Sequence, residues 1–207
     1  MGKGMRAYEI WQNCLVSHDE IIRDLFVESP FVHPSVMCRK ETVIGVGGYR
    51  DMGWAEDYDL WLRLADAGVR FARLPETLFF WRERPERATR NLPEYFREAF
   101  RACKVHHLKN GFLQGEQEVI LAGGGVEGRG WRRALNRDGI RVSLWVDVDP
   151  RKIGRILHGA PVVGSAEVLP GMGKMLITVG TPGAREGVRE WARTSGFREG
   201  KDFLCVT

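Results

Sequence analysis

Long hydrophobic runs and paired cysteines are both missing from this sequence of 207 residues. No stretch approaches the roughly 20 apolar residues of a membrane-spanning helix. The first residues lack the apolar core of a secretory signal peptide. The four cysteines have no paired spacing, so reduced and mostly buried thiols are the simplest interpretation. These absences predict a cytoplasmic protein without a transmembrane segment. The cysteines are Cys14, Cys38, Cys103 and Cys205.

A strong charge of one sign is missing as well. The net charge is +4, from 31 basic and 27 acidic residues, which is too mild to indicate nucleic-acid binding. Four of the five histidines show no metal-binding spacing with a cysteine or a second histidine, and surface or core roles are favoured for them. The fifth, His33, stands before Pro34-Ser35 and is a candidate for the wall of an active site. The other four are His18, His106, His107 and His158.

The most informative segment present is 53–63, where the adjacent carboxylates Glu56 and Asp57 begin a predicted amphipathic helix. Leu60, Leu64 and Ala67 have the i, i+4, i+7 spacing of one helix face, with Trp61 beside them and Gly68 as the stop. Acids in a first turn often serve only the helix dipole, worth up to about 1 kcal/mol. For Glu56 and Asp57, both a structural role at the helix dipole and a chemical role therefore stay open.

The neighbouring motifs favour chemistry. His33-Pro34-Ser35 and then Gly47-Gly48-Tyr49 precede the helix, and Leu74-Pro75-Glu76-Thr77-Leu78 lies downstream of it. In this order they resemble the acceptor-side half of family 2 glycosyltransferases of the GT-A fold, which carry an HPS-type strand, a GGY turn, an ED-x-DLW-x-R helix and an LPE-x-L strand. The resemblance covers roughly residues 25–90, and it is specific as a set.

The resemblance implies an inverting transfer from a nucleotide-sugar to a sugar or lipid-linked acceptor. Asp57 would be the general base on the acceptor hydroxyl, and Glu56 would orient it. The exposed N–H groups of the helix start are expected to keep Asp57 ionised. Acceptor or substrate binding is expected of His33, Gly47, Gly48, Tyr49 and Arg63.

Arginines follow the LPE-x-L segment, which in the resembling family comes near the nucleotide phosphates. The planar guanidinium suits a diphosphate. A solvated loop and helix face with interleaved ion pairs is the competing interpretation. The candidate phosphate ligands are Arg82, Arg84 and Arg87.

Such enzymes begin with a nucleotide-binding half that ends in an Asp-x-Asp motif holding a divalent metal, Mg or Mn. No such half precedes His33, and Asp57-Tyr58-Asp59 lies in the predicted helix, where i and i+2 point apart. We therefore expect the C-terminal part of a longer enzyme, a truncated relative of one, or a chain that works with a partner chain. The metal ligands are not found in this chain.

A second region begins near residue 117, after a polar joint at 114–117, which predicts domains at 1–112 and 117–207. Short apolar strands alternate with helices there, as in a parallel sheet. The expected fold class is α/β: a partial GT-A-like region followed by a small Rossmann-like domain. The expected strands are 118–122, 141–147, 161–163, 175–180 and 202–206, with helices at 166–169 and 184–195.

Gly123, Gly125 and Gly128 satisfy G-x-G-x-x-G between a strand and a helix, and Asp147 ends the next strand. This pattern is typical of nucleotide binding, with NAD(P) as one possible ligand. The same glycines could serve only to pack the strand against the helix, and Glu127 would repel a pyrophosphate. The alternatives to a transferase are therefore a nucleotide-binding or regulatory module without catalysis, and a non-catalytic interaction subunit.

Overall fold

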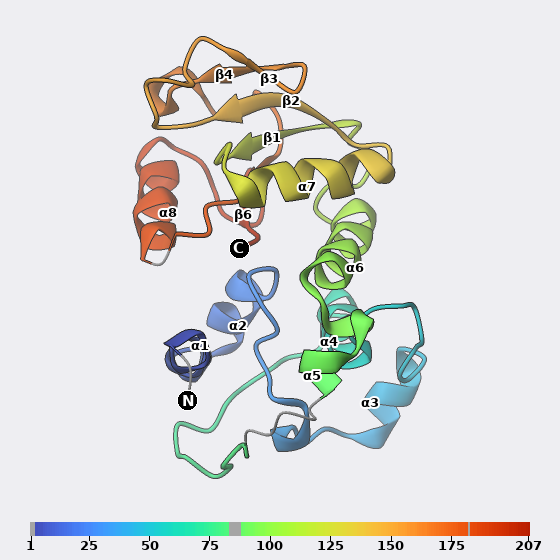
Figure 1. Cartoon of the computed structure of the whole chain (residues 1–207). Coiled ribbons are helices and arrows are strands. Elements are labelled where there is room, and N and C mark those ends of the chain that lie inside the picture. The colour runs from blue at the N-terminus through green and yellow to red at the C-terminus, as the bar shows by residue number, and fades with distance from the viewer. Residues whose placement is uncertain (1–2, 83–87, 182) are drawn as a thin grey trace. The chain divides into compact units, whose positions relative to one another are not determined.

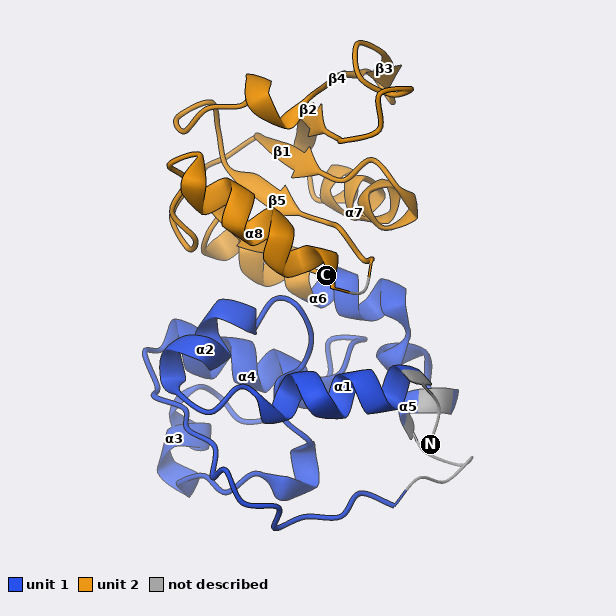
Figure 2. Cartoon of the chain, turned by 90° about the vertical axis from the view of Figure 1, so that its left-hand side faces the viewer, with its two compact units in different colours: residues 1–103 blue, residues 104–207 orange. Residues whose placement is uncertain are grey.

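The computed structural model describes residues 3–82, 88–181 and 183–207. The chain divides into two compact units, residues 1–103 and residues 104–207 (Figure 2). The division falls inside α6 (Arg97–Asn110), whereas the predicted joint at 114–117 lies between α6 and β1 (Glu118–Ala122). Within the described residues, no helix has the length and apolar character needed to cross a bilayer.

Unit 1 is built from helices and connecting segments (Figure 1). The capping box of α2 (His18–Asp24) is complete, because Ser17 Oγ accepts from the Glu20 N–H and Glu20 accepts from the Ser17 N–H. The remaining elements are α1 (Lys3–Asn13), η1 (His33–Ser35), α3 (Lys40–Gly45), α4 (Glu56–Asp66), α5 (Ala88–Asn91), η2 (Pro93–Tyr95) and the first half of α6.

The two strands expected in unit 1 do not form. His33-Pro34-Ser35 is a 3-10 turn, and 71–82 has no strand. A strand needs a hydrogen-bonded neighbour for its backbone groups. The described residues of unit 1 supply none, since every strand of the described chain belongs to unit 2. The order of the motifs indicated which segments contribute to the site, but it did not predict their secondary structure.

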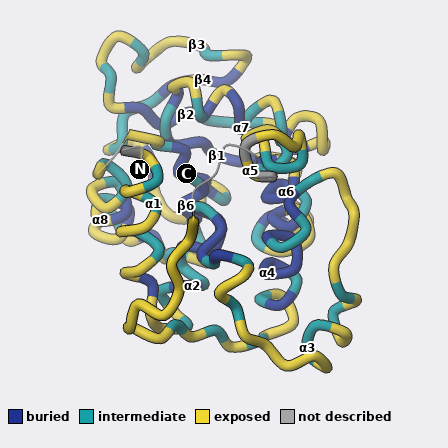
Figure 3. The backbone as a smooth tube through the Cα atoms, turned by 60° about the horizontal axis from the view of Figure 1, so that its bottom comes forward, coloured by how far each residue is buried: buried dark blue, intermediate teal, exposed yellow. Residues whose placement is uncertain are grey.

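The helix α4 has the predicted start and stop. It begins at Glu56 and ends at Asp66, and Gly68 follows with a φ of 73°. Its body is buried nearly all round, which Figure 3 shows as dark blue. Ala67, expected in the core, is exposed, because the helix has ended there. The buried residues of α4 are Tyr58, Asp59, Leu60, Trp61, Leu62 and Leu64.

Unit 2 is the expected Rossmann-like α/β fold. Its sheet has the order β3-β4-β2-β1-β5-β6, and all its pairings are parallel except that of β3 with β4. The helices α7 (Val126–Arg137) and α8 (Ala184–Thr194) lie on opposite faces of the sheet (Figure 2). The other strands are β2 (Arg141–Val146), β3 (Ile156–Leu157), β4 (Ala160–Val163), β5 (Met175–Ile177) and β6 (Phe203–Cys205).

One sequence prediction for unit 2 and one for the cysteines of the chain need correction. The helix expected at 166–169 is a single 3-10 turn, η3 (Ser165–Glu167), and the short strand β3 had no alternating pattern to reveal it. None of the four cysteines, all of which the structure describes, forms a disulfide, and Cys103 and Cys205 are buried. Cys14 and Cys38 are exposed, so the thiols are not mostly buried.

The turn between β1 and α7 requires two of its three motif glycines. Gly123 has a φ of 108°, in the region that favours glycine. A Cβ on Gly128 would lie 1.9 Å from the Gly123 carbonyl oxygen. This close approach of helix to strand would occur with or without a ligand.

We therefore expect Gly128→Ala to destabilise unit 2 by about 3 kcal/mol, because the clash is with backbone that cannot move aside. Urea unfolding followed by circular dichroism measures the change. Gly187→Ala in α8 is the matched control, since a Cβ there meets nothing within 4 Å. A Gly128→Ala protein with the wild-type unfolding midpoint would refute the packing argument.

Candidate active site

The two carboxylates at the start of α4 reach the surface from a helix that is otherwise buried. The Glu56 side chain is 38% exposed and that of Asp57 is 16% exposed. Asp57 Oδ1 accepts a 2.7 Å hydrogen bond from the Tyr58 N–H. The structure thus leaves both carboxylates open to solvent and holds Asp57 in a partly desolvated position.

His33 lies between the carboxylates and Tyr49. Its Nδ1 is 3.9 Å from Glu56 Oε1 and 3.9 Å from Asp57 Oδ2. Its Nε2 forms a 2.8 Å hydrogen bond with the Tyr49 hydroxyl. The fold therefore brings the HPS segment, the glycine turn and the acidic helix start together, although they are separated in sequence.

Tyr95 contacts Glu56 and forms with Glu56, Asp57, His33 and Tyr49 a group that we call the α4 cluster. No sequence pattern pointed to Tyr95. Its hydroxyl donates a 2.7 Å hydrogen bond to Glu56 Oε2. Burial, and then this hydrogen bond, raise the pKa of Tyr95, which keeps the phenol protonated as a donor. No motif marked Tyr95, because a contact across 39 residues leaves no local pattern.

The glycine turn that carries Tyr49 is stabilised by hydrogen bonds from Arg63. Gly47 and Gly48 have φ of 86° and 65°, which only glycine adopts readily. Arg63 donates from Nη1 to the Val46 carbonyl at 2.6 Å and from Nη2 to the Gly48 carbonyl at 2.7 Å. Its Nε donates to Asp59 at 2.7 Å, and its side chain is only 10% exposed. These bonds give Arg63 a supporting position behind the turn.

Burial raises the pKa of Asp57 above its ordinary value of 3.8. The Tyr58 N–H opposes this rise, the charge of Glu56 adds to it, and His33 opposes it. The sequence predicted that helix-start N–H groups would keep Asp57 ionised. Such a bond is present, but desolvation outweighs it, so the net direction of the pKa shift is upward. A carboxylate with a raised pKa is the stronger base.

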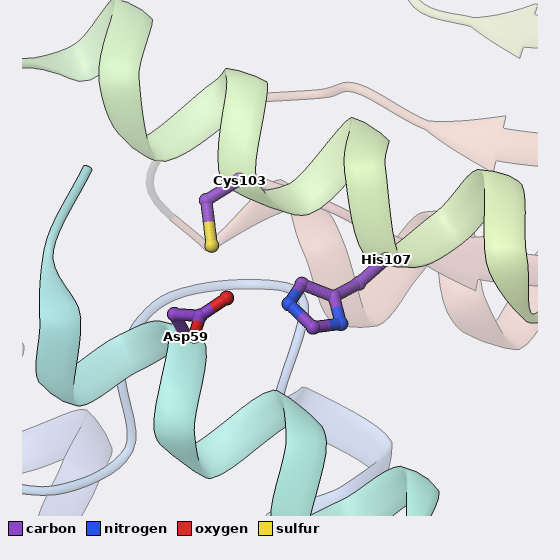
Figure 4. A group of neighbouring side chains, drawn as sticks. All are labelled: Asp59, Cys103 and His107. Carbon is purple, nitrogen blue, oxygen red and sulfur yellow. The ribbon is translucent and has the colours of Figure 1, made fainter. Parts of the chain in front are cut away.

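Asp57 and Asp59 lie in different surroundings on α4. Asp59 is buried and accepts from Trp54 Nε1 at 3.3 Å and from Arg63. Figure 4 shows Asp59 of α4 opposite Cys103 of α6, with His107 one turn further along α6, and their ligand atoms lie within 4.8 Å of one another. The i, i+4 spacing of Cys103 and His107 is a ligand-like signal that the sequence analysis overlooked.

Of the three predicted phosphate ligands, only one can be placed. Arg82 is exposed. Arg84 and Arg87 lie outside the described residues. Their proposed role therefore stays a prediction from the sequence.

In unit 2, Asp147 accepts hydrogen bonds that hold the glycine turn in place. Its Oδ2 accepts from the Gly124 N–H at 3.0 Å and from Lys152 Nζ at 2.7 Å, and its Oδ1 accepts from the Asp149 N–H at 2.9 Å. Burial pushes the pKa of Asp147 upward, but Lys152 and these N–H groups outweigh burial and lower it. Asp149 pairs with Arg151 at 3.0 Å, so both Asp147 and Asp149 are engaged by basic side chains.

Comparison with known proteins gives partial matches to bacterial glycosyltransferases, and no family model matches. The chain is 37% identical over 81 residues to an uncharacterized glycosyltransferase of Haemophilus influenzae, covering 39% of this chain and 30% of that protein. It is 38% identical over 63 residues to the amylovoran biosynthesis glycosyltransferase AmsE of Erwinia amylovora, covering 30% of this chain and 24% of that protein.

A third relative is the O-antigen biosynthesis glycosyltransferase WbnJ of Escherichia coli, 34% identical over 68 residues, which are 32% of this chain and 27% of that protein. The chain thus spans less than a third of the length of each of these relatives. Part of this chain is similar to glycosyltransferases, and this similarity supports glycosyl transfer in general.

Proposed function

We propose that this chain carries the acceptor-activating part of an inverting, family 2-like glycosyltransferase of the GT-A type, with Asp57 as the general base. The observation that carries the proposal is the partly desolvated Asp57 carboxylate, still open to solvent and clustered with Glu56 and His33. The similarity of part of the chain to glycosyltransferases supports the reaction class.

In the proposed step the acceptor hydroxyl attacks the anomeric carbon of a nucleotide-activated sugar. The new bond joins the acceptor oxygen to that carbon, and the bond from the carbon to the diphosphate oxygen breaks. The diphosphate leaves with the electron pair, and the acceptor proton passes to Asp57. Attack opposite the leaving group inverts the anomeric configuration. The hydroxyl becomes acidic only as the new bond forms, which suits a carboxylate base.

The other residues of the cluster position this base. Tyr95 fixes Glu56, and the charge of Glu56 raises the pKa of Asp57. His33, held by Tyr49, faces both carboxylates at 3.9 Å and lines one side of the site. We propose that the acceptor approaches along this side, past the turn formed by Gly47 and Gly48.

A divalent metal is expected of complete enzymes of this type, but the Asp-x-Asp pairs do not fit it. Asp59 is engaged by Arg63, Asp147 by Lys152 and Asp149 by Arg151. Neither pair, among the described residues, offers two carboxylates to one ion. The proposal therefore concerns the acceptor side of the reaction, and its step involves only the residues of the α4 cluster.

In an enzyme that includes the nucleotide-binding half, replacing Asp57 by Asn should lower the rate of transfer roughly 10²–10⁴-fold, because the amide cannot take the proton. Binding of the nucleotide-sugar should stay within about twofold, since the loss is confined to the transition state. Transfer of radiolabelled sugar from a panel of nucleotide-sugars measures the rate, and equilibrium dialysis measures donor binding.

Asp19→Asn is the matched control for this experiment. Asp19 is also an acid in the first turn of a helix, α2, but it is exposed and it has no place in the cluster. Its replacement should remove a similar helix-dipole contribution and leave transfer unchanged. Transfer by the Asp57→Asn protein at the wild-type rate would rule out the assignment of the base.

The pH dependence of kcat/KM should show an acid limb set by Asp57. The carboxylate must be ionised to act, and its pKa in the folded protein is raised, so the rate falls as pH drops through a value above 3.8. Glu56→Gln removes a charge that raises this pKa, so the limb should move to lower pH even as the rate falls. Glu41→Gln, in the first turn of α3, should leave the limb in place. A Glu56→Gln limb that moves to higher pH would contradict the charge coupling.

A further inference from the structure

Unit 2 contains an open cavity of about 920 Å³ at the carboxyl ends of β1, β2 and β5. Ala122 ends β1, Val146 ends β2, and Thr178 follows β5, and all three line the cavity. β1 has β2 on one side and β5 on the other, so the chain reverses its direction of travel across the sheet here. Parallel sheets commonly bind ligands at such a point. The volume lies within the range of small-molecule sites.

One wall of the cavity is an apolar face of α8. Ala184, Gly187, Val188 and Trp191 line it, with the i, i+3, i+4, i+7 spacing of a single helix face. The same helix buries Arg189 completely on another face, where it pairs with Glu199 at 2.8 Å. α8 therefore packs with one face and leaves a second apolar face open to the cavity.

Two exposed valines also line the cavity. Val126 at the start of α7 and Val148 after β2 both line the cavity, and they are 71% and 83% exposed. Exposed valines and a tryptophan in one cavity suit a flat, weakly polar group that covers them on binding. The walls thus favour a ring over a compact ion.

Two glycines in these walls are not required by the fold. A Cβ on Gly125 or Gly187 would meet nothing within 4 Å, and neither residue has a positive φ. Gly187 stands inside α8, where glycine costs about 1 kcal/mol relative to alanine. Gly123 and Gly128, by contrast, are explained by their backbone geometry and packing. Both unexplained glycines keep the cavity walls free of side chains.

The charged groups of the cavity are suited to hydroxyls more than to phosphates. Glu127 and Asp147 line it with Lys152, and Lys152 already pairs with Asp147 at 2.7 Å. The Gly124 N–H, which belongs to the glycine turn, already donates a hydrogen bond to Asp147. Two carboxylates against one lysine repel a diphosphate, whereas ribose hydroxyls can donate to them.

We propose that this cavity binds the nucleoside part of a nucleotide, with the base against the apolar face of α8 and the ribose hydroxyls toward Asp147 and Glu127. The base and ribose supply the affinity, and the phosphates add little. The proposal concerns unit 2 alone and is independent of the transfer chemistry assigned to Asp57.

Isothermal titration of the whole chain with uridine, adenosine, UDP, ADP and NAD tests this proposal. At least one nucleoside should bind at a single site, and its diphosphate should bind within about threefold of it. Binding of uridine would connect the cavity to nucleotide-sugars, and binding of adenosine to adenine nucleotides. Either result supports the proposal.

Gly187→Leu should weaken that binding at least about tenfold, because the side chain enters the space left for the base. Leucine favours the helix, so α8 should keep its fold, and circular dichroism checks this. Gly4→Leu is the matched control, since Gly4 is a helical glycine of α1 with nothing within 4 Å.

Three results would overturn the proposal. The first is no saturable binding of any of these compounds up to about 5 mM. The second is a diphosphate that binds more than about tenfold tighter than its nucleoside, because the phosphates would then dominate. The third is unchanged affinity in a correctly folded Gly187→Leu protein.

Discussion

The candidate active site depends on one constraint: α4 is fixed in the core of unit 1 along its body while its first turn reaches the solvent. Tyr58, Leu60 and Trp61 are almost completely buried, so the helix cannot rotate without breaking the core. Asp57 therefore keeps one orientation and remains partly desolvated. That desolvation raises its pKa, which ties the packing of the helix to the chemistry proposed for its first turn.

The same helix also orders the turn opposite. Arg63, two helical turns after Glu56, bonds Asp59 on its own helix and the carbonyls of Val46 and Gly48. A buried guanidinium without these partners would cost several kcal/mol, so the pairing fixes the turn that carries Tyr49. Tyr49 in turn bonds His33, which faces the carboxylates. Core packing and site geometry are thus parts of one hydrogen-bonded arrangement.

Local periodicity explains which features could be predicted from the sequence. The bounds of α4 and the positions of β1, β2, β4, β5 and β6 follow from apolar spacing and from glycine stops, which act within a few residues. The strands expected at 33–35 and 74–78 failed because strand formation depends on a distant partner. Tyr95 and the supporting role of Arg63 were unpredictable for the same reason, since each depends on contacts between segments distant in sequence.

The pKa of Asp57 shows the limit of arguing from residue type alone. Its position at a helix start predicted stabilisation of the charge, and the Tyr58 N–H does provide it. The degree of burial decides the net direction of the pKa shift of Asp57. Burial is a property of the fold. The glycine motif of unit 2 has the same ambiguity, because Gly123 and Gly128 are needed for packing whatever the turn binds.

The most direct test of the central claim is a site-specific titration of the Asp57 carboxyl carbon by NMR in this chain. The account predicts a midpoint above the ordinary value of 3.8, because burial and Glu56 outweigh the hydrogen bond from the Tyr58 N–H. A midpoint at or below 3.8 would mean that Asp57 is an ordinary helix-capping acid, and the assignment of the base would lose its physical support.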